Sequence, residues 1–185
     1  MERTACSQTG SGKTAAFLLP IMNKLLWDAD LSLITDGPCR PQALILAPTR
    51  ELAIQIHAQA TKFAEGTLVK CEIAYGGSAF IQQKKRVEKG VIILVGTIGR
   101  IKHFINEGVI NLDQTKFLVL DEADRMLDMV FAEQVKEMME SGGIAGKEPV
   151  MEKGVIIREA RQTLLFSATS PKAVRSLANE LLRGD

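Results

Sequence analysis

Residues 7–14, Ser-Gln-Thr-Gly-Ser-Gly-Lys-Thr, stand directly before an apolar helical stretch. Backbone N–H groups at a glycine-rich helix N-terminus converge on an anion. Lys13 adds a positive charge for the β- and γ-phosphates of a nucleotide, and the Thr14 hydroxyl is a ligand for Mg²⁺. The stretch predicts a phosphate-binding loop, although Ser7 replaces the glycine that opens the general pattern. Its predicted nucleotide-binding residues are Ser7, Gln8, Thr9, Gly10, Ser11, Gly12, Lys13 and Thr14.

Two other interpretations of this glycine-rich stretch stay open. Residues 10–15, Gly-Ser-Gly-Lys-Thr-Ala, also fit the dinucleotide-binding fingerprint. That fingerprint needs an acidic residue about 20 positions later, at the end of the next strand. The next predicted strand ends in Leu46-Ala47-Pro48, without a carboxylate. The remaining alternative is a glycine-rich turn with no ligand, and the phosphate loop is favoured over both.

A second group of chemically active residues follows the apolar run 117–120, where the chain reads Asp121-Glu122-Ala123-Asp124. A carboxylate after a buried strand can hold Mg²⁺, usually through water. Glu122 beside it can orient or deprotonate a water that attacks a γ-phosphate. The alternative is an acidic first turn of a helix, stabilised by the helix dipole. The phosphate loop upstream favours the nucleotide site.

These residues need a scaffold that brings them together, and the hydrophobic pattern predicts one. Short apolar runs alternate with longer helical stretches, and the runs are apolar throughout, as in strands covered on both faces. The expected class is α/β, a mostly parallel sheet with helices on both faces, whose ligands bind at the carboxyl ends of the strands. The predicted strands are 43–47, 68–75, 91–95, 117–120 and 163–166, and the predicted helices are 13–26, 51–64, 80–87, 100–106, 131–139 and 172–182.

Three local features qualify this prediction. Pro20 lies inside the first helix, where we expect one bent helix, the alternative being a helix that stops near Leu19. Trp27 is expected to close the core at the end of that helix. The stretch 141–159 is long for a loop, so it is either a surface insertion or contains a strand at 155–157. No linker divides the chain, which predicts one domain.

Composition limits the class of protein. The chain has 185 residues, 46% hydrophobic and 24% charged, which excludes a disordered or collagen-like protein. The net charge of +1 gives no whole-chain argument for nucleic acid, but residues 78–103 carry six basic and one acidic residue, and 107–152 carry eleven acidic and four basic ones.

Cysteine usage and the lack of a signal sequence bear on the compartment. Three cysteines without a Cys-x-x-Cys pair argue against a disulfide framework or a zinc site. No apolar run reaches the length of a membrane span, and no signal peptide is recognisable at Met1. We expect an intracellular protein, cytoplasmic or nuclear, with the cytoplasm favoured.

Further motifs follow other predicted strands: Pro-Thr-Arg-Glu-Leu at 48–52, Gly76-Gly77, Thr-Ile-Gly-Arg at 97–100 and Ser-Ala-Thr at 167–169. Together with the glycine-rich loop and the Asp-Glu-Ala-Asp box, in this order, they resemble the DEAD-box family of superfamily 2 RNA helicases. The match is to the first of the family's two RecA-like domains, and 15–20 and 121–128 are most similar to its Vasa-like branch. Ser7 replaces an alanine of the family pattern, and Ile98 replaces a proline.

The resemblance implies a RecA-like P-loop fold, the cofactors ATP and Mg²⁺, and a role for each matching residue. Glu122, Asp121 and Lys13 would be catalytic, with Thr14 and Asp121 organising Mg²⁺. The residues that would link hydrolysis to domain closure are Asp124, Ser167 and Thr169. Those that would hold single-stranded or duplex RNA by its sugar-phosphate backbone are Pro48, Thr49, Arg50, Gly76, Gly77, Thr97, Gly99 and Arg100. Helix caps and plain turns remain the alternatives for the single residues.

The resemblance also carries an expectation about domain organisation. Residues 1–185 would be the helicase ATP-binding domain, cut inside its first strand, with the second RecA-like domain absent. The whole protein would couple ATP hydrolysis to RNA duplex unwinding or to remodelling of RNA–protein complexes. This chain alone would bind ATP·Mg²⁺ and RNA weakly, hydrolyse ATP very slowly and unwind nothing, because an arginine supplied by the second domain is missing. The alternatives are a catalytically inactive RNA-binding or scaffold paralogue, and a P-loop ATPase acting on DNA or protein.

Overall fold

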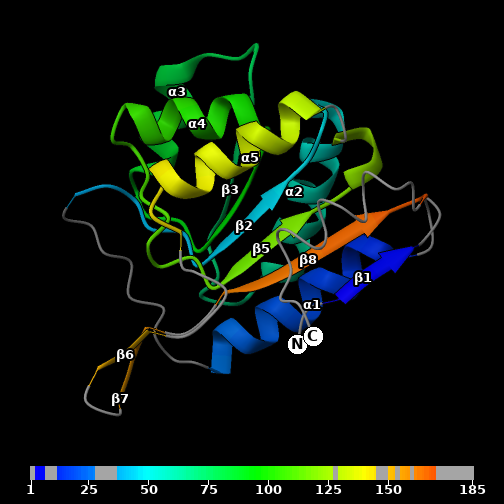
Figure 1. Cartoon of the computed structure of the whole chain (residues 1–185), viewed down its shortest axis with the longest axis horizontal. Coiled ribbons are helices and arrows are strands. Elements are labelled where there is room, and N and C mark those ends of the chain that lie inside the picture. Colours follow the sequence, from blue (N-terminus) through cyan, green and yellow to red (C-terminus); the bar gives the residue numbers. More distant parts are fainter. Residues whose placement is uncertain are drawn as a thin grey trace.

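Runs of four to six mostly apolar residues form the central sheet of the molecule (Figure 1). The computed structural model describes residues 3–6, 12–27, 37–126, 129–144, 150–152, 155–158 and 161–169. Six strands lie in the order β1-β8-β5-β2-β4-β3, and every neighbouring pair is parallel. Their bounds are Arg3–Cys6 (β1), Ala43–Leu46 (β2), Cys71–Ala74 (β3), Ile93–Gly96 (β4), Phe117–Leu120 (β5) and Gln162–Ser167 (β8).

Helices cover both faces of this sheet, as the apolar strands predict. Alternate residues of one strand serve opposite faces: Leu44 and Leu46 pack with the helices α3, α4 and α5, while Ala43 and Ile45 pack with α1 and α2. The helices are Lys13–Trp27 (α1), Arg50–Ala64 (α2), Phe80–Val87 (α3), Ile98–Asn106 (α4) and Met129–Ser141 (α5), with a short 3-10 helix at Ala123–Met126 (η1). The α/β class and the parallel sheet are therefore confirmed.

The strand register brings the predicted motifs to one edge of the sheet. Leu46, which ends β2, is opposite Leu120 of β5 and Gly96 of β4, and Gly96 is opposite Ala74 of β3. On the other side, Cys6 of β1 is opposite Ser167, the last residue of β8. Each chemically active segment follows one of these strand ends, so the segments meet at the carboxyl edge.

The first helix answers two of the sequence expectations. α1 continues through Pro20 from Lys13 to Trp27, so the single helix is confirmed. The prediction for Trp27 is wrong, because this side chain is 79% exposed. The buried stripe of α1 runs through Phe17, Ile21 and Leu25 at a spacing of four residues. Trp27 lies two positions after Leu25, which turns it about 200° away from the core.

Outside the central sheet, residues 150–158 contain an antiparallel pair, Val150–Glu152 (β6) and Val155–Arg158 (β7). The strand suspected at 155–157 is thus present. The predicted helix 172–182 lies outside the described residues. Across the described part of the chain, no helix combines the length and the apolar character that a membrane crossing requires.

Candidate active site

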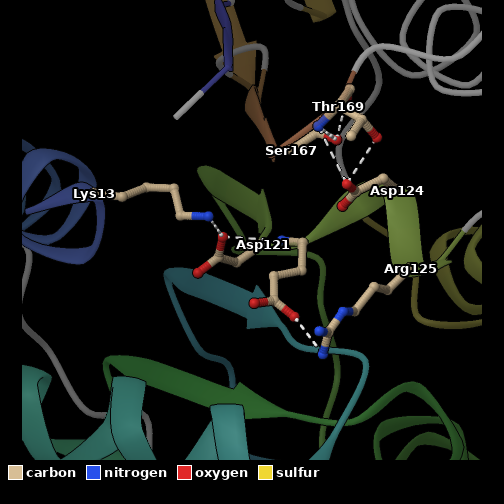
Figure 2. A network of polar contacts seen from close by, with 7 residues as sticks. Lys13, Asp121, Asp124, Arg125, Ser167 and Thr169 are labelled. Atoms are coloured by element: carbon tan, nitrogen blue, oxygen red, sulfur yellow. Dashed lines mark hydrogen bonds and ion pairs between the residues drawn. The ribbon is translucent and has the colours of Figure 1, made fainter. Parts of the chain in front are cut away.

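An ion pair between Lys13 and Asp121 forms the centre of the candidate site. Lys13 begins α1, and Asp121 is the first residue after β5. Figure 2 shows the two side chains pointing toward each other, and Lys13 Nζ lies 3.1 Å from Asp121 Oδ1. Both are buried, with side-chain exposures of 8% and 1%. Two residues 108 positions apart are therefore brought into direct contact by the parallel sheet. Ser7 to Ser11 of the predicted loop lie outside the described residues.

Glu122, next in the chain, has an unusual backbone. Its φ is +53°, in the left-handed region, and among the described residues no other non-glycine residue has a positive φ. Such a conformation costs about 1–3 kcal/mol and is concentrated at functional sites. The Glu122 N–H donates to Asp121 Oδ1 at 2.9 Å, which fixes the turn.

The Glu122 carboxylate is mostly buried, and one of its oxygens lacks a hydrogen-bond donor. Its side chain is 13% exposed, and Oε2 lies 3.3 Å from Nη1 of Arg125 in an ion pair. The orientation of that pair does not suit a hydrogen bond, and buried Oε2 has no hydrogen-bond partner in the described part of the protein. A buried carboxylate oxygen without a donor can accept a hydrogen bond from water or a ligand.

A cavity of about 400 Å³ opens beside these groups. Its volume lies in the range of small-molecule sites. It is lined by Gly12, Lys13, Thr14, Leu52, Gln55, Gln59, Asp121 and Glu122. Two of these residues, Gln55 and Gln59 of α2, were not predicted from the sequence, and Leu52 was named there only as the last residue of the 48–52 motif. The available signal was their spacing, three and then four residues after Leu52, which places them on the same helix face as the end of that motif.

The donor set beside the cavity fits a hard cation next to a phosphate. Asp121 offers a buried carboxylate, and Thr14 lies on the same cavity. Mg²⁺ prefers oxygen ligands and is usually held by one or two protein groups plus substrate phosphates and water. No group of three or more His, Cys, Asp or Glu side chains forms a ready-made metal cage among the residues that the structure describes. The buried Asp121 carboxylate and the nearby Thr14 fit a cation whose other ligands are phosphates and water.

Asp124, Ser167 and Thr169 form a second polar network, above the ion pair in Figure 2. Asp124 Oδ2 accepts hydrogen bonds from Thr169 Oγ1 at 2.9 Å and from Thr169 N at 3.2 Å. The Ser167 hydroxyl donates to the Thr169 carbonyl. These contacts join the turn after β5 to the end of β8, and the link from this network to domain closure stays a prediction.

This network makes the stability of the fold sensitive to acid. Burial by itself would raise the pKa of Asp124, but hydrogen bonds from Thr169 and Ser167 outweigh it and hold the pKa below its ordinary value of 3.8. The unfolded chain therefore takes up the proton first, so the stabilisation is complete above about pH 5 and is lost as the pH falls below about 4. Because Asp124 is only partly buried, solvent screens its contacts, and we expect an effect below about 1 kcal/mol.

Urea denaturation between pH 3 and pH 6 would measure this contribution. The Asp124→Asn variant should be less stable than the unmodified chain at pH 6, and the difference should shrink toward pH 3. Glu133→Gln, at an exposed carboxylate on α5, is the matched control and should leave the profile unchanged. A constant difference at every pH would contradict the assignment.

The segments predicted to hold RNA lie at the same carboxyl edge, after β2, β3 and β4. Thr49 is the N-cap of α2, and its hydroxyl accepts from Leu52 N at 3.2 Å, so the simple capping role is present in the structure. Thr97 is the N-cap of α4, but its side chain makes no capping hydrogen bond. Arg50 is exposed, and Pro48 is half-buried. The Arg50 side chain is 53% exposed, and its Nε lies 3.4 Å from Glu51 Oε1 in an ion pair at the surface.

The glycines of this edge present open backbone, whereas Arg100 does not point to solvent. Gly76, Gly77 and Gly99 are exposed. Gly77 has a φ of +75°, and a Cβ there would lie 2.7 Å from Nη1 of Arg50, so the two motifs are in contact. The Arg100 guanidinium instead donates to the Ser78 carbonyl at 3.0 Å and to Gln83 Oε1 at 3.4 Å.

Comparison with known proteins gives a consistent result. The family model described as DEAD/DEAH box helicase matches residues 2–177. The chain is 48% identical over 180 residues to ATP-dependent RNA helicase glh-1 of Caenorhabditis elegans, covering 97% of this chain and 22% of that protein. It is 45% identical over 180 residues to ATP-dependent RNA helicase vasa of Drosophila melanogaster, covering 97% of this chain and 24% of that protein. The crystal structure of a DEAD box protein from the hyperthermophile Methanococcus jannaschii aligns with a TM-score of 0.72 and 34% identity, over 98% of this chain and 43% of that one.

Proposed function

We propose, from the premise that this chain belongs to the DEAD/DEAH box helicase family, that it binds ATP with Mg²⁺ and grips the backbone of RNA along one edge of its sheet. The chain spans about a quarter of the length of the relatives glh-1 and vasa. We therefore also propose that it acts as the first of two RecA-like domains. The whole protein would couple ATP hydrolysis to the unwinding of RNA duplexes or the remodelling of RNA–protein complexes.

The observation that carries the ATP proposal is the buried Lys13–Asp121 pair at a cavity that also receives Glu122. Lys13 would turn from Asp121 to the β- and γ-phosphates of the nucleotide. Thr14 and Asp121 would hold Mg²⁺, which when bound would neutralise negative charge on the phosphates. Glu122 would orient the attacking water and accept its proton through its carboxylate, which borders the cavity. Gly12 would present its backbone to a phosphate.

The support for RNA is the set of groups at the carboxyl edge. Arg50, the Thr97 hydroxyl and the exposed backbone at Gly76, Gly77 and Gly99 are suited to phosphate and sugar oxygens, and none of them reads a base. Three further residues would contribute at the same edge. They are Pro48, Thr49 through its cap of α2, and Arg100 through its hydrogen bond to the Ser78 carbonyl. Such contacts favour single strands of any sequence.

The network of Asp124, Ser167 and Thr169 would report the state of the nucleotide site to a second domain. It begins at Asp124, three residues after Asp121, and ends at Thr169, two residues after β8. The arrangement fits a switch that responds to occupancy of the site.

We also propose an intracellular protein, cytoplasmic rather than nuclear. The free thiols of Cys39 and Cys71 support a reducing compartment.

Binding measurements on the 185-residue chain test this proposal. A fluorescent ATP analogue should bind in the presence of Mg²⁺. A fluorescein-labelled single-stranded RNA should bind when the ATP analogue is also present. A DNA of the same sequence should bind more weakly, because it lacks the 2′-hydroxyls. RNA binding without any nucleotide binding would favour the scaffold paralogue, and equal affinity for RNA and DNA would favour an ATPase that acts on DNA.

A further inference from the structure

Gln83, a residue outside every sequence motif, is buried beneath the proposed RNA edge. It lies on α3, and its exposed fraction is 1%. Its side-chain amide pairs with the backbone of Tyr75 on both sides: Tyr75 N donates to Oε1 at 3.1 Å, and Nε2 donates to the Tyr75 carbonyl at 3.1 Å. Gln83 thus completes the backbone pairing of the residue that connects β3 to Gly76 and Gly77.

Arg100 extends this contact to the segment after β4. Its Nη1 donates to Gln83 Oε1 at 3.4 Å, and its Nη2 donates to the Ser78 carbonyl at 3.0 Å. The guanidinium carbon lies 5.6 Å from the ring centre of Phe80 and 6.0 Å from that of Phe104. Arginine is suited to this position because its planar fork can donate to two acceptors while it contacts aromatic rings.

The two contacts hold both ends of the Gly76-Gly77 loop. Gln83 fixes Tyr75 on the side before the glycines, and Arg100 fixes Ser78 on the side after them. Gly77 itself lies against Arg50 of the neighbouring segment. A glycine loop is otherwise conformationally free, and fixing it before binding avoids an entropic cost at the moment of binding.

We propose that Gln83 and Arg100 are positioning residues that preorganise the Gly76-Gly77 loop for the RNA backbone, and that Arg100 acts through this loop rather than by touching a phosphate. The proposal rests on the RNA-binding function proposed above. It predicts that RNA affinity depends on the planar, forked shape of the Arg100 side chain, and that a positive charge alone at this position does not maintain the affinity.

The experiment compares variants of the 185-residue chain in binding to a fluorescein-labelled single-stranded RNA at several salt concentrations. Gln83→Met keeps the size of the side chain without its hydrogen bonds, and Arg100→Lys keeps the charge without the fork. Each should weaken RNA binding about tenfold, the effect of losing roughly 1.4 kcal/mol of buried hydrogen bonding. The dependence of affinity on salt should not change, because no phosphate contact is lost.

Matched controls lie on the same helix. Gln82→Met alters the exposed neighbour of Gln83, and Arg86→Lys alters an exposed arginine. Both should bind RNA within about twofold of the unmodified chain, the range expected of surface substitutions. Affinity for the ATP analogue should be unchanged in all four variants, which separates a local effect on the loop from general destabilisation.

Amide hydrogen exchange without RNA gives an independent readout. Gln83→Met should accelerate exchange at Tyr75, whose N–H loses its acceptor, and Gln82→Met should not. Unchanged exchange at Tyr75 would overturn the inference, as would Arg100→Lys binding like the unmodified chain. A third contradicting result concerns Arg100→Ala. The slope of log binding constant against log salt concentration would become shallower by about 0.7, the value for one lost phosphate contact with a single strand. If the unmodified chain binds no RNA, the RNA-binding function fails instead.

Discussion

Replacing Glu122 with glutamine should lower the rate of ATP hydrolysis by about 10²–10⁴-fold, the usual contribution of a general base. The change removes the negative charge but keeps the size of the side chain and the left-handed backbone at this residue. Nucleotide affinity should stay within about twofold of the original, since the phosphates are held by Lys13 and the loop rather than by Glu122. The result would separate a catalytic role for Glu122 from a binding role.

Phosphate release from radiolabelled ATP is the appropriate measurement. It can be made in a chimera in which residues 1–185 replace the matching segment of the Drosophila vasa helicase, which is 45% identical over 180 residues. Glu133→Gln makes the same chemical change at an exposed position on α5 and should keep the full rate. Equal rates for Glu122→Gln and this control would exclude Glu122 as the base. A chimera without RNA-stimulated hydrolysis would favour the scaffold paralogue.

Replacing Lys13 with alanine should weaken binding of the ATP analogue at least about 30-fold, equivalent to roughly 2 kcal/mol for a buried charged partner. Lys13 is the cation that the structure places in the cavity, and its charge is already desolvated beside Asp121. Lys62→Ala, an exposed lysine on α2, is the control and should bind normally. Normal binding by Lys13→Ala would place the nucleotide elsewhere.

A substitution of Asp121, the ion-pair partner of Lys13, should affect the affinity for the ATP analogue only when Mg²⁺ is present. Asp121→Asn should lower the affinity measured with Mg²⁺ but not the affinity measured in EDTA. Without the carboxylate, Lys13 has no competing anion and is free for the phosphates, while the cation loses a ligand. Equal losses with Mg²⁺ and in EDTA would mean that Asp121 only supports the local fold.

The helix and strand pattern of this chain could be predicted because its signals are local. Uniformly apolar runs such as Phe117–Leu120 need cover on both faces, and the helices between them supply it. Errors occurred where a residue's direction depends on the rotation of a helix. Trp27 is apolar and ends α1, yet the spacing of the buried residues turns it into solvent.

The site was predicted less completely, for a related reason. Lys13, Asp121 and Glu122, which line one cavity, could be predicted as site residues because glycine-rich and acidic segments next to strands carry their own chemical pattern. Gln55 and Gln59 share the cavity but belong to no motif. Arg125, which pairs with Glu122, is likewise one ordinary arginine among many in the sequence. Their roles depend on which helix face meets the cavity.

The types and order of the motifs, and the parallel sheet that brings them to one edge, can be read from the amino-acid sequence alone. Both follow from local composition and from the rule that parallel strands end on the same side. The directions of the side chains, by contrast, follow from how the helices and strands pack. Packing turns Arg100 inward to Gln83 and Ser78 and places Gln55 and Gln59 on the cavity. Such pairings arise when distant elements pack, because buried polar groups must then find partners that lie close in space, whatever their separation in the chain.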